Sequence, residues 1–192
     1  MGGTFHKGDN TGEMGDYLPF TNIGTGRTIS SLEIGFSSIY VQLDDKSLKS
    51  WGYNNQGQLG QGHTNNIGDN ANEMGDYLQP LLMPSGVSIL SHNGGYFHHG
   101  IVTTDGDLYL WGRGTSGQLG NGNSSYDYGD DPNEMGDYIP KVNLGTGLTA
   151  VDFEGGELHT CVVLSTYDLK CFGSNNYGQI GFLIVNQFTN RL

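Results

Sequence analysis

The stretch Trp51-Gly-Tyr-Asn-Asn-Gln-Gly-Gln-Leu-Gly60 decides the fold of this chain, because the same pattern occurs three times. It returns as Trp111-Gly-Arg-Gly-Thr-Ser-Gly-Gln-Leu-Gly120 and as Phe172-Gly-Ser-Asn-Asn-Tyr-Gly-Gln-Ile-Gly181. Regular self-similarity at a period of several tens of residues indicates an array of one supersecondary unit. The repeat is therefore the main sequence evidence for the fold.

A second phrase, Glu-Met-Gly-Asp-Tyr, keeps the same period. It begins at Glu13, Glu73 and Glu134, so its spacings are 60 and 61 residues. Together the two phrases define one domain of three units, 8–67, 68–128 and 129–192, of which 182–192 is an atypical tail.

Each unit has the same order: an acidic loop, a short apolar strand, a β-hairpin and a glycine-rich turn. The apolar strands are expected at 29–34, 87–90 and 148–153, and the hairpins at 39–51, 100–111 and 161–172. Asp105-Gly106 between two apolar runs is a strong hairpin signal, and no window has the periodicity of a helix. The pattern predicts an all-β fold of the propeller type or a related β repeat.

The two ends of the chain depart from the period. Residues 1–7 align with the end of a unit, and residues 182–192 do not follow the pattern. We therefore expect the chain to be a slice of a longer array, with a native closing strand at the C-terminus as the alternative. Open strand edges would pair with further repeats of the same array or with another chain.

Composition argues against two classes of partner. The formal net charge is −12, with only 8 Lys and Arg residues, and these form no cluster. A nucleic-acid-binding protein needs a cationic surface to displace counterions from phosphates. A membrane-spanning helix needs about 20 consecutive apolar residues, and the sequence contains no such stretch. We expect no nucleic-acid partner and no membrane partner.

The three ten-residue stretches resemble the repeats of the RCC1 (regulator of chromosome condensation 1) family. Gly155-Gly156-x-x-His159-Thr160-Cys161 adds a further feature of that family. The resemblance implies a β-propeller, usually seven-bladed, with four-stranded blades. The Glu-Met-Gly-Asp-Tyr loop resembles the extra length of a variant in bacterial and algal-type members.

Structural roles are expected at the positions that repeat in every unit. A large ring followed by Gly at a strand end predicts packing between neighbouring blades, and Gln58, Gln118 and Gln179 predict amides that bind turn backbone. His98 and His159 align with Ser38, which predicts a hydrogen-bonding position. The repeated ring and glycine positions are Trp51, Trp111, Phe172, Gly57, Gly60, Gly117, Gly120, Gly178 and Gly181.

The stretch Gly112-Arg-Gly114-Thr-Ser-Gly117 formally matches the dinucleotide-binding pattern. The other units hold Asn54 and Asn175 at the position of Gly114. Because Gly and Asn are the residues that tolerate a positive φ, the substitution predicts a left-handed turn and no cofactor site.

Cys161 and Cys171 flank the third hairpin. A three-residue loop would place them opposite each other, whereas a two-residue turn would pair Cys161 with Phe172. The first register predicts a disulfide, and since directly opposed residues have Cβ atoms about 4.5–5.5 Å apart, the bond needs some local adjustment. The alternative is two buried thiols. A disulfide indicates an oxidising compartment, so we expect an extracellular or secreted protein, with the cytoplasm as the alternative.

The acidic loops are candidate metal-ligating elements. Blades related by one rotation should present equivalent loops on one face, and their oxygen ligands suit Ca²⁺. However, the spacing lacks the dense alternation of a dedicated calcium loop, so a hydrogen-bonded structural loop is the alternative, with the Met and Tyr of each phrase as apolar anchors. The carboxylates are Asp9, Glu13, Asp16, Asp69, Glu73, Asp76, Asp130, Asp131, Glu134 and Asp137.

No arrangement of nucleophile, base and orienting group repeats in the chain, so we expect no enzymatic activity. The leading hypothesis is a non-enzymatic module for protein–protein interaction or structure, which requires no cofactor apart from the candidate Ca²⁺. The resemblance implies a second hypothesis, a guanine-nucleotide exchange factor for a small GTPase. A third is a secreted surface protein stabilised by calcium.

Overall fold

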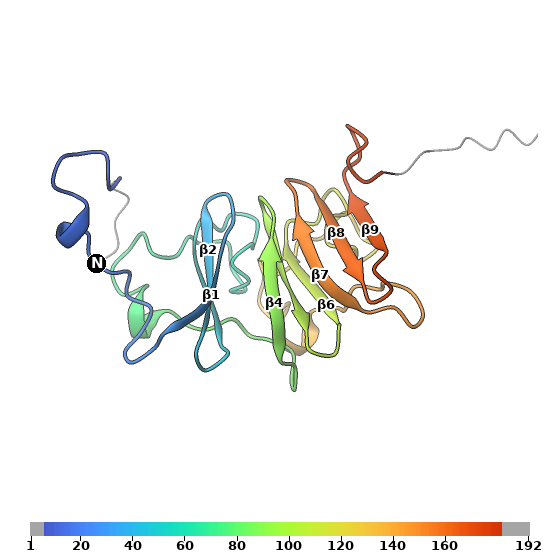
Figure 1. The fold of residues 1–192 in the computed structure, drawn as a ribbon, viewed down its shortest axis with the longest axis horizontal. Helices are drawn as coiled ribbons and strands as arrows, with labels where there is room; N and C mark the ends of the chain where they lie inside the picture. The colour runs from blue at the N-terminus through green and yellow to red at the C-terminus, as the bar shows by residue number, and fades with distance from the viewer. Residues whose placement is uncertain (1–5, 182–192) are drawn as a thin grey trace, which may run out of the picture.

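The protein, seen in a computed structural model that describes residues 6–181, consists of three antiparallel β-sheets (Figure 1). Three strands form each sheet, in chain order. The first holds β1 (Ile29–Ile34), β2 (Ser38–Leu43) and β3 (Leu48–Gly52). The second holds β4 (Ile89–Gly94), β5 (His98–Thr103) and β6 (Leu108–Gly112), and the third holds β7 (Ala150–Gly155), β8 (His159–Leu164) and β9 (Leu169–Gly173).

The only helical elements among the described residues are three short 3₁₀ turns: η1 (Gly15–Tyr17), η2 (Gly75–Tyr77) and η3 (Gly136–Tyr138). Each one is the end of a Glu-Met-Gly-Asp-Tyr phrase. No helix among residues 6–181 is long and apolar enough to cross a membrane. The all-β class predicted from the repeat is therefore confirmed.

The predicted hairpins lie within about two residues of the observed strands, but the strands expected at 87–90 and 148–153 begin later. Each of these first strands contains a register shift, for example between Ile89 and Ser91. The strand β4 continues through polar residues such as His92, which is buried against the first sheet. A search for apolar runs misses a strand whose polar residues are buried between sheets.

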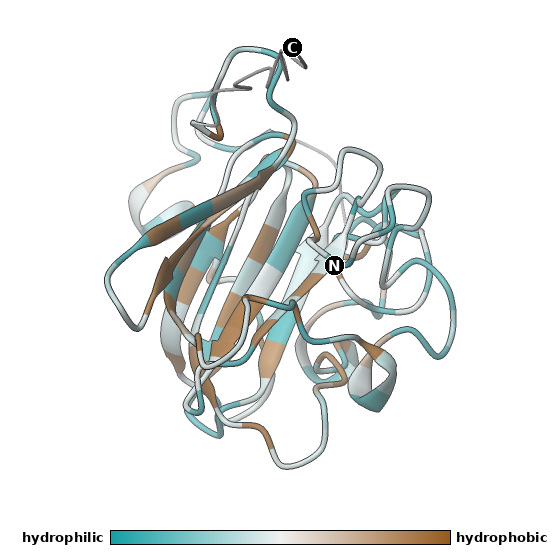
Figure 2. Ribbon diagram, turned by 90° about the vertical axis from the view of Figure 1, so that its right-hand side faces the viewer, coloured by the Kyte–Doolittle hydropathy of each residue, from teal (hydrophilic) through white to brown (hydrophobic). Residues whose placement is uncertain are grey.

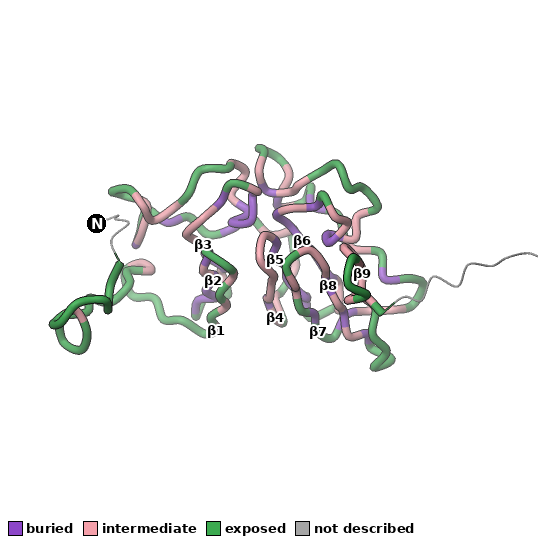
Figure 3. The backbone as a smooth tube through the Cα atoms, turned by 90° about the horizontal axis from the view of Figure 1, so that it is seen from above, coloured by how far each residue is buried: buried purple, intermediate pink, exposed green. Residues whose placement is uncertain are grey.

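The sheets are arranged as neighbouring blades. Among the first strands, β4 contacts both β1 and β7, whereas the third strands lie away from them (Figure 3). Side chains link neighbouring sheets: Ser31 Oγ of β1 lies 2.7 Å from His92 Nε2 of β4, and His98 Nε2 of β5 lies 2.8 Å from Thr160 Oγ1 of β8. This arrangement places β1, β4 and β7 toward a common axis and the loops between units at the outer rim.

The segments on either side of the second and third acidic loops complete the first and second sheets. Before each loop, Gly52 pairs with Ile67, and Gly112 pairs with Tyr128. Further along, the N–H of Leu81 donates to the carbonyl of Leu48 at 2.8 Å. The outer edge of each of the first two sheets therefore receives a segment from the next sequence unit, which supplies partners for backbone groups that an edge strand would leave unpaired.

The core fills the two spaces between sheets, and hydrophobic residues run along the strands (Figure 2). Trp111, Tyr40 and Phe153 are the largest fully buried side chains. Between the first and second sheets lie Tyr40, Leu48, Leu81, Ile101, Tyr109, Trp111, Met135 and Ile139. Between the second and third lie Val102, Leu108, Leu110, Leu119, Leu144, Ala150, Phe153, Val162 and Leu164.

The prediction of a left-handed backbone at Asn54, Gly114 and Asn175 is wrong. None of the three has a positive φ. The buried Asn54 accepts a hydrogen bond from the N–H of Leu59 at 2.8 Å and donates to the carbonyl of His63 at 2.6 Å. In the second unit a Cβ at Gly114 would collide with the carbonyl of Tyr126. The position requires either an amide that bonds the turn or no side chain at all.

The third sheet contains the disulfide between Cys161 and Cys171, so this prediction is confirmed. The two residues are direct cross-strand partners with Cα atoms 4.0 Å apart. Phe172 pairs with Thr160, which excludes the register of a two-residue turn. The predicted tail at 182–192 lies outside the described residues.

Candidate functional site

The repeated glutamines stabilise the glycine-rich turns. The Oε1 atom of Gln58 accepts the N–H of Gln56 at 2.9 Å, and that of Gln118 accepts the N–H of Ser116 at 2.8 Å. Gln179 accepts the N–H of Tyr177 in the same way. Each amide oxygen accepts a backbone hydrogen bond within its own turn, so these side chains have a structural role.

The glutamates of the acidic loops bind the backbone of their own loops. The carboxylate of Glu73 accepts the N–H groups of Gly68 at 2.8 Å and Asn70 at 2.9 Å. Glu13 and Glu134 repeat this pattern. These hydrogen bonds lower the pKa of Glu73, although partial desolvation opposes them. The glutamates therefore act as internal caps that hold each loop in shape.

The aspartates of the same phrases bind across units. Asp76 accepts the N–H and the hydroxyl of Thr25, both at 2.7 Å. Asp137 accepts the N–H of Ser85 at 2.6 Å and its hydroxyl at 2.8 Å. The bonds to Thr25 and Ser85 lower the pKa values of Asp76 and Asp137. Each aspartate therefore fastens its loop to the turn that precedes the first strand of the neighbouring sheet.

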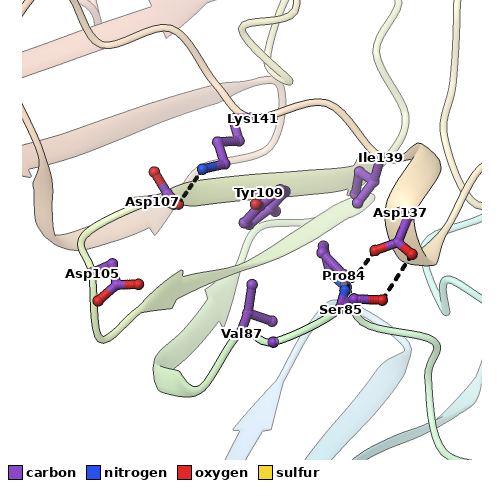
Figure 4. A pocket seen from close by; sticks show the side chains of 10 residues that line it. Pro84, Ser85, Val87, Asp105, Asp107, Tyr109, Asp137, Ile139 and Lys141 are labelled. Carbon is purple, nitrogen blue, oxygen red and sulfur yellow. Dashed lines mark hydrogen bonds and ion pairs between the residues drawn. The ribbon is translucent and has the colours of Figure 1, made fainter.

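Figure 4 shows a polar cavity of about 460 Å³ beside the second of these contacts. The Ser85–Asp137 pair lies at one end, an ion pair of 2.6 Å between Lys141 and Asp107 lies at the other, and Tyr109 stands between them. The equivalent of Tyr109 in the first sheet is Lys49, whose ammonium donates to the carbonyl of Ile23. The polar groups of this cavity therefore bind one another, and the cavity itself identifies no ligand.

The acidic loops of the second and third units lie along the outer edges of the first and second sheets, because the segment that follows each loop pairs with a third strand. That equivalent loops share one face stays a prediction. The expectation that the tyrosines anchor the loops is wrong, since Tyr17, Tyr77 and Tyr138 are all exposed. Among the methionines of the three phrases, only Met135 is buried in the core.

The candidate calcium ligands are spread over three loops and are used in hydrogen bonds within and between units. Among residues 6–181 no group of three or more His, Cys, Asp or Glu side chains could hold a metal ion. Calcium binding stays a prediction.

Three buried histidines lie between the sheets. Burial lowers the pKa of His92 and of His98 to about 4, and that of His99 well below its usual range. The short contact between Ser31 and His92 resembles part of a catalytic pair, but the Nδ1 atom of His92 has no hydrogen-bond partner within the described region. The third group that would orient such a histidine is missing there.

An aromatic cluster was not predicted from the sequence. The ring of Phe36, which follows β1, stacks on that of Tyr96, which follows β4, with centroids 3.7 Å apart. Phe97 contacts both rings, and Arg113 lies 5.8 Å above Phe97. Phe36 is 58% exposed. The signal available in the sequence was an aromatic residue at the same loop position, after Gly35 and Gly95, in two successive units.

Carboxylates lie next to this aromatic cluster. Phe36, Tyr96 and Glu157 come from equivalent turns of the three sheets and line one depression of about 350 Å³. On the adjacent inner strands, Glu33 lies close enough to Glu154 and Asp152 for their negative charges to act on its carboxylate. Burial, followed by these two like charges, raises the pKa of Glu33. We call Glu33, Phe36, Tyr96, Glu154 and Glu157 the axial surface.

Comparisons with known proteins identify the repeat. The regulator of chromosome condensation (RCC1) repeat family matches residues 105–163, and a second description of the same repeat matches residues 150–179.

Two relatives match over most of this chain. The chain is 30% identical to the X-linked retinitis pigmentosa GTPase regulator homolog of Caenorhabditis elegans over 151 residues, which cover 79% of this chain and 10% of that protein. It is 31% identical to the ultraviolet-B receptor UVR8 of Arabidopsis thaliana over 159 residues, which cover 81% of this chain and 32% of that protein. The chain thus spans a third or less of the length of these relatives.

A solved structure supports the fold. Yeast RCC1 (Prp20), in its crystal structure bound to Kap60, is similar with a TM-score of 0.56 at 22% sequence identity, over 77% of this chain and 32% of that one. This likeness shows that the three sheets are propeller blades.

Proposed function

Because the chain carries repeats of the regulator of chromosome condensation (RCC1) type, we propose that it is a non-enzymatic protein-binding module. The axial surface binds a basic segment of a protein partner. The observation that carries this proposal is the exposed ring of Phe36, stacked on the half-buried Tyr96, beside Glu157 and the mutually repelling inner carboxylates.

The chemistry of the axial surface suits Arg and Lys side chains. Aromatic faces attract guanidinium and ammonium groups, and the attraction grows when the cation is desolvated. Burial, and then the like charges of Glu154 and Asp152, raise the pKa of Glu33, and a basic side chain would offset those charges. The net charge of −12 favours the approach of a basic partner over long distances.

Relatives support protein binding in general terms. Yeast RCC1 (Prp20) has been crystallised in complex with Kap60. Interfaces are enriched in aromatic residues relative to the rest of a protein surface, and the exposed ring of Phe36 lies outside both core clusters.

The experiment is selection of a phage-displayed random peptide library on the immobilised chain, followed by binding measurements with the enriched peptides. We expect enriched peptides to contain Arg or Lys and to lose affinity roughly tenfold or more in Phe36→Ala, since central aromatic residues carry much of the energy of an interface. Tyr167→Ala, an exposed aromatic in the turn between β8 and β9, is the matched control. Enrichment of peptides without basic residues, or equal binding to Phe36→Ala, would refute the proposal.

A second candidate function rests on a relative whose name describes a GTPase regulator. In that case the chain would act as a guanine-nucleotide exchange factor for a small GTPase. The test is release of a fluorescent GDP analogue from a panel of small GTPases. Acceleration by catalytic amounts of the chain would favour this function over simple binding.

A further inference from the structure

The junctions between neighbouring sheets follow one rule. At both internal junctions, the aspartate of a Glu-Met-Gly-Asp-Tyr phrase binds a Thr or Ser of the previous unit through two hydrogen bonds. The preceding glycine adds a backbone bond: Gly75 donates to Asn22, and Gly136 donates to Leu82, both at 3.0 Å. One set of contacts is therefore built twice with the same spacing.

The first strands of the sheets also repeat one packing contact at both internal junctions. At one position of the first strand, His92 and Phe153 are only 5% and 1% exposed, because each packs against the preceding sheet. The equivalent residue of β1 is Leu32, and it is 52% exposed. One face of the first sheet thus presents an apolar side chain that its counterparts bury.

At the outer edge of the third sheet, a leucine is exposed where the other two sheets bury theirs under a described segment. Leu48 and Leu108 begin the third strands of their sheets and are fully buried, because the segment after the next acidic loop covers them. Their equivalent in β9 is Leu169, which is 63% exposed. Lys170 donates to the carbonyl of Leu144, whereas Lys49 binds both Ile23 and a carbonyl of the following loop, that of Gly75.

The first acidic loop carries the groups that would cover this edge. Its residues Met14, Tyr17, Leu18 and Phe20 are exposed, and none of the interactions found for the described residues joins Asp16 to a Thr or Ser. On the third sheet, Thr146 occupies the position of Thr25 and Ser85, and Asn143 that of Asn22 and Leu82. The spacing therefore matches Asp16 with Thr146, and Gly15 with the carbonyl of Asn143.

We propose that a second copy of this chain binds head to tail, so that residues 13–21 of one copy lie along β9 of the other. Asp16 accepts hydrogen bonds from Thr146 of the neighbouring copy, and residues 18–21 cover Leu169. The same placement brings Leu32 onto the face of the third sheet that contains the disulfide.

One rotation generates all of these contacts, because it is the rotation that already relates successive sheets within the chain. This continuity with the two internal junctions is the reason to choose a second copy as the occupant. The contact is heterologous, so it produces closed rings or open chains of copies rather than a two-fold symmetric dimer.

The test is sedimentation velocity over a concentration series of the whole chain. We expect reversible association, weakened roughly tenfold or more in Asp16→Ala and in Thr146→Val, since hydrogen bonds to charged groups are among the stronger ones. Asp9→Ala removes the same charge outside the proposed contact and is the control. A wild-type chain that stays monomeric at about 100 µM, a concentration at which micromolar association is complete, would overturn the proposal.

Mixing the two variants separates this geometry from other interfaces. Asp16→Ala keeps Thr146, and Thr146→Val keeps Asp16, so an equimolar mixture can form one intact junction that neither variant forms alone. We expect mixed dimers with near wild-type affinity. An absence of this rescue, with both variants folded by circular dichroism, would show that the copies meet elsewhere.

Discussion

The indole nitrogen of Trp111 donates a 2.9 Å hydrogen bond to the carbonyl of Gln58, and so joins the second sheet to the glycine-rich turn of the first. Tyr40 donates its hydroxyl to the same carbonyl at 2.6 Å. One turn carbonyl therefore accepts hydrogen bonds from two of the largest buried side chains. Without it, the indole N–H and the tyrosine hydroxyl would be buried donors without partners, which costs free energy.

We expect Trp111→Phe to lower the free energy of unfolding by about 1–2 kcal/mol, through the lost hydrogen bond and the smaller ring. Trp111→Ala should cost about 3–5 kcal/mol because it leaves a cavity between the sheets. Urea denaturation followed by far-UV circular dichroism measures both changes. Trp51→Phe is the control, since Trp51 is only half-buried, and an equal loss in that variant would contradict the role of the Gln58 contact.

The buried histidines predict a dependence of stability on pH. Burial lowers the pKa of His92 and His98 to about 4, below the value of about 6.5 in an unfolded chain. The unfolded state therefore binds more protons between these values, so their contribution to stability is complete above about pH 6.5 and is lost as the pH falls toward 4.

His98→Ser tests this relationship, because serine occupies the equivalent position 38 of the first unit. We expect the variant to lose less stability than the wild type between pH 7 and pH 5, by on the order of 1–2 kcal/mol. Urea titrations at the two pH values give the difference. His6→Gln changes an exposed histidine, and a similar effect in that control would argue against burial as the cause.

The disulfide predicts a covalent contribution to the third sheet. We expect the intact mass to rise by two hydrogen atoms on reduction under denaturing conditions. Replacement of both Cys161 and Cys171 by Ser should lower stability by about 2–3 kcal/mol, as closure of a short loop does in the chain-entropy account. An unchanged mass, or equal stability with and without reductant, would contradict the bond.

Much of the fold follows from local sequence. The turn at Asp105-Gly106 was predictable, because hairpin pairing depends on a few adjacent residues. The register that opposes Cys161 to Cys171 was one of two that the sequence left open, and the structure decides it. The strand through His92 was misplaced because its polar residues are buried by another sheet. The Asn54 position was misread because Asn serves equally well in a left-handed turn and as a side chain that bonds the turn.

The candidate sites were less accessible to sequence reasoning. A period shows that Asp76 and Asp137 are equivalent, but it does not say which sheet their loops join, and the loops join the preceding one. Phe36 and Tyr96 lie 60 residues apart in the sequence, and only the rotation between sheets stacks their rings. Contacts between units depend on this rotation, which no local pattern encodes.

The capping role of Glu73 gives a prediction that also bears on calcium. Glu73→Gln should lower the free energy of unfolding by about 1 kcal/mol, because an amide is a weaker acceptor for the N–H groups of Gly68 and Asn70 than a carboxylate. The stability that Glu73 contributes to the wild type should decrease as the pH falls below about 4.5, since hydrogen bonding lowers the pKa of Glu73 in the folded state. Thermal denaturation in EDTA and in CaCl₂ measures the change, and Asp69→Asn is the charge-matched control. If Glu73 acts as a cap, the loss is the same in both solutions; a loss confined to CaCl₂ would show that the loop instead binds the metal.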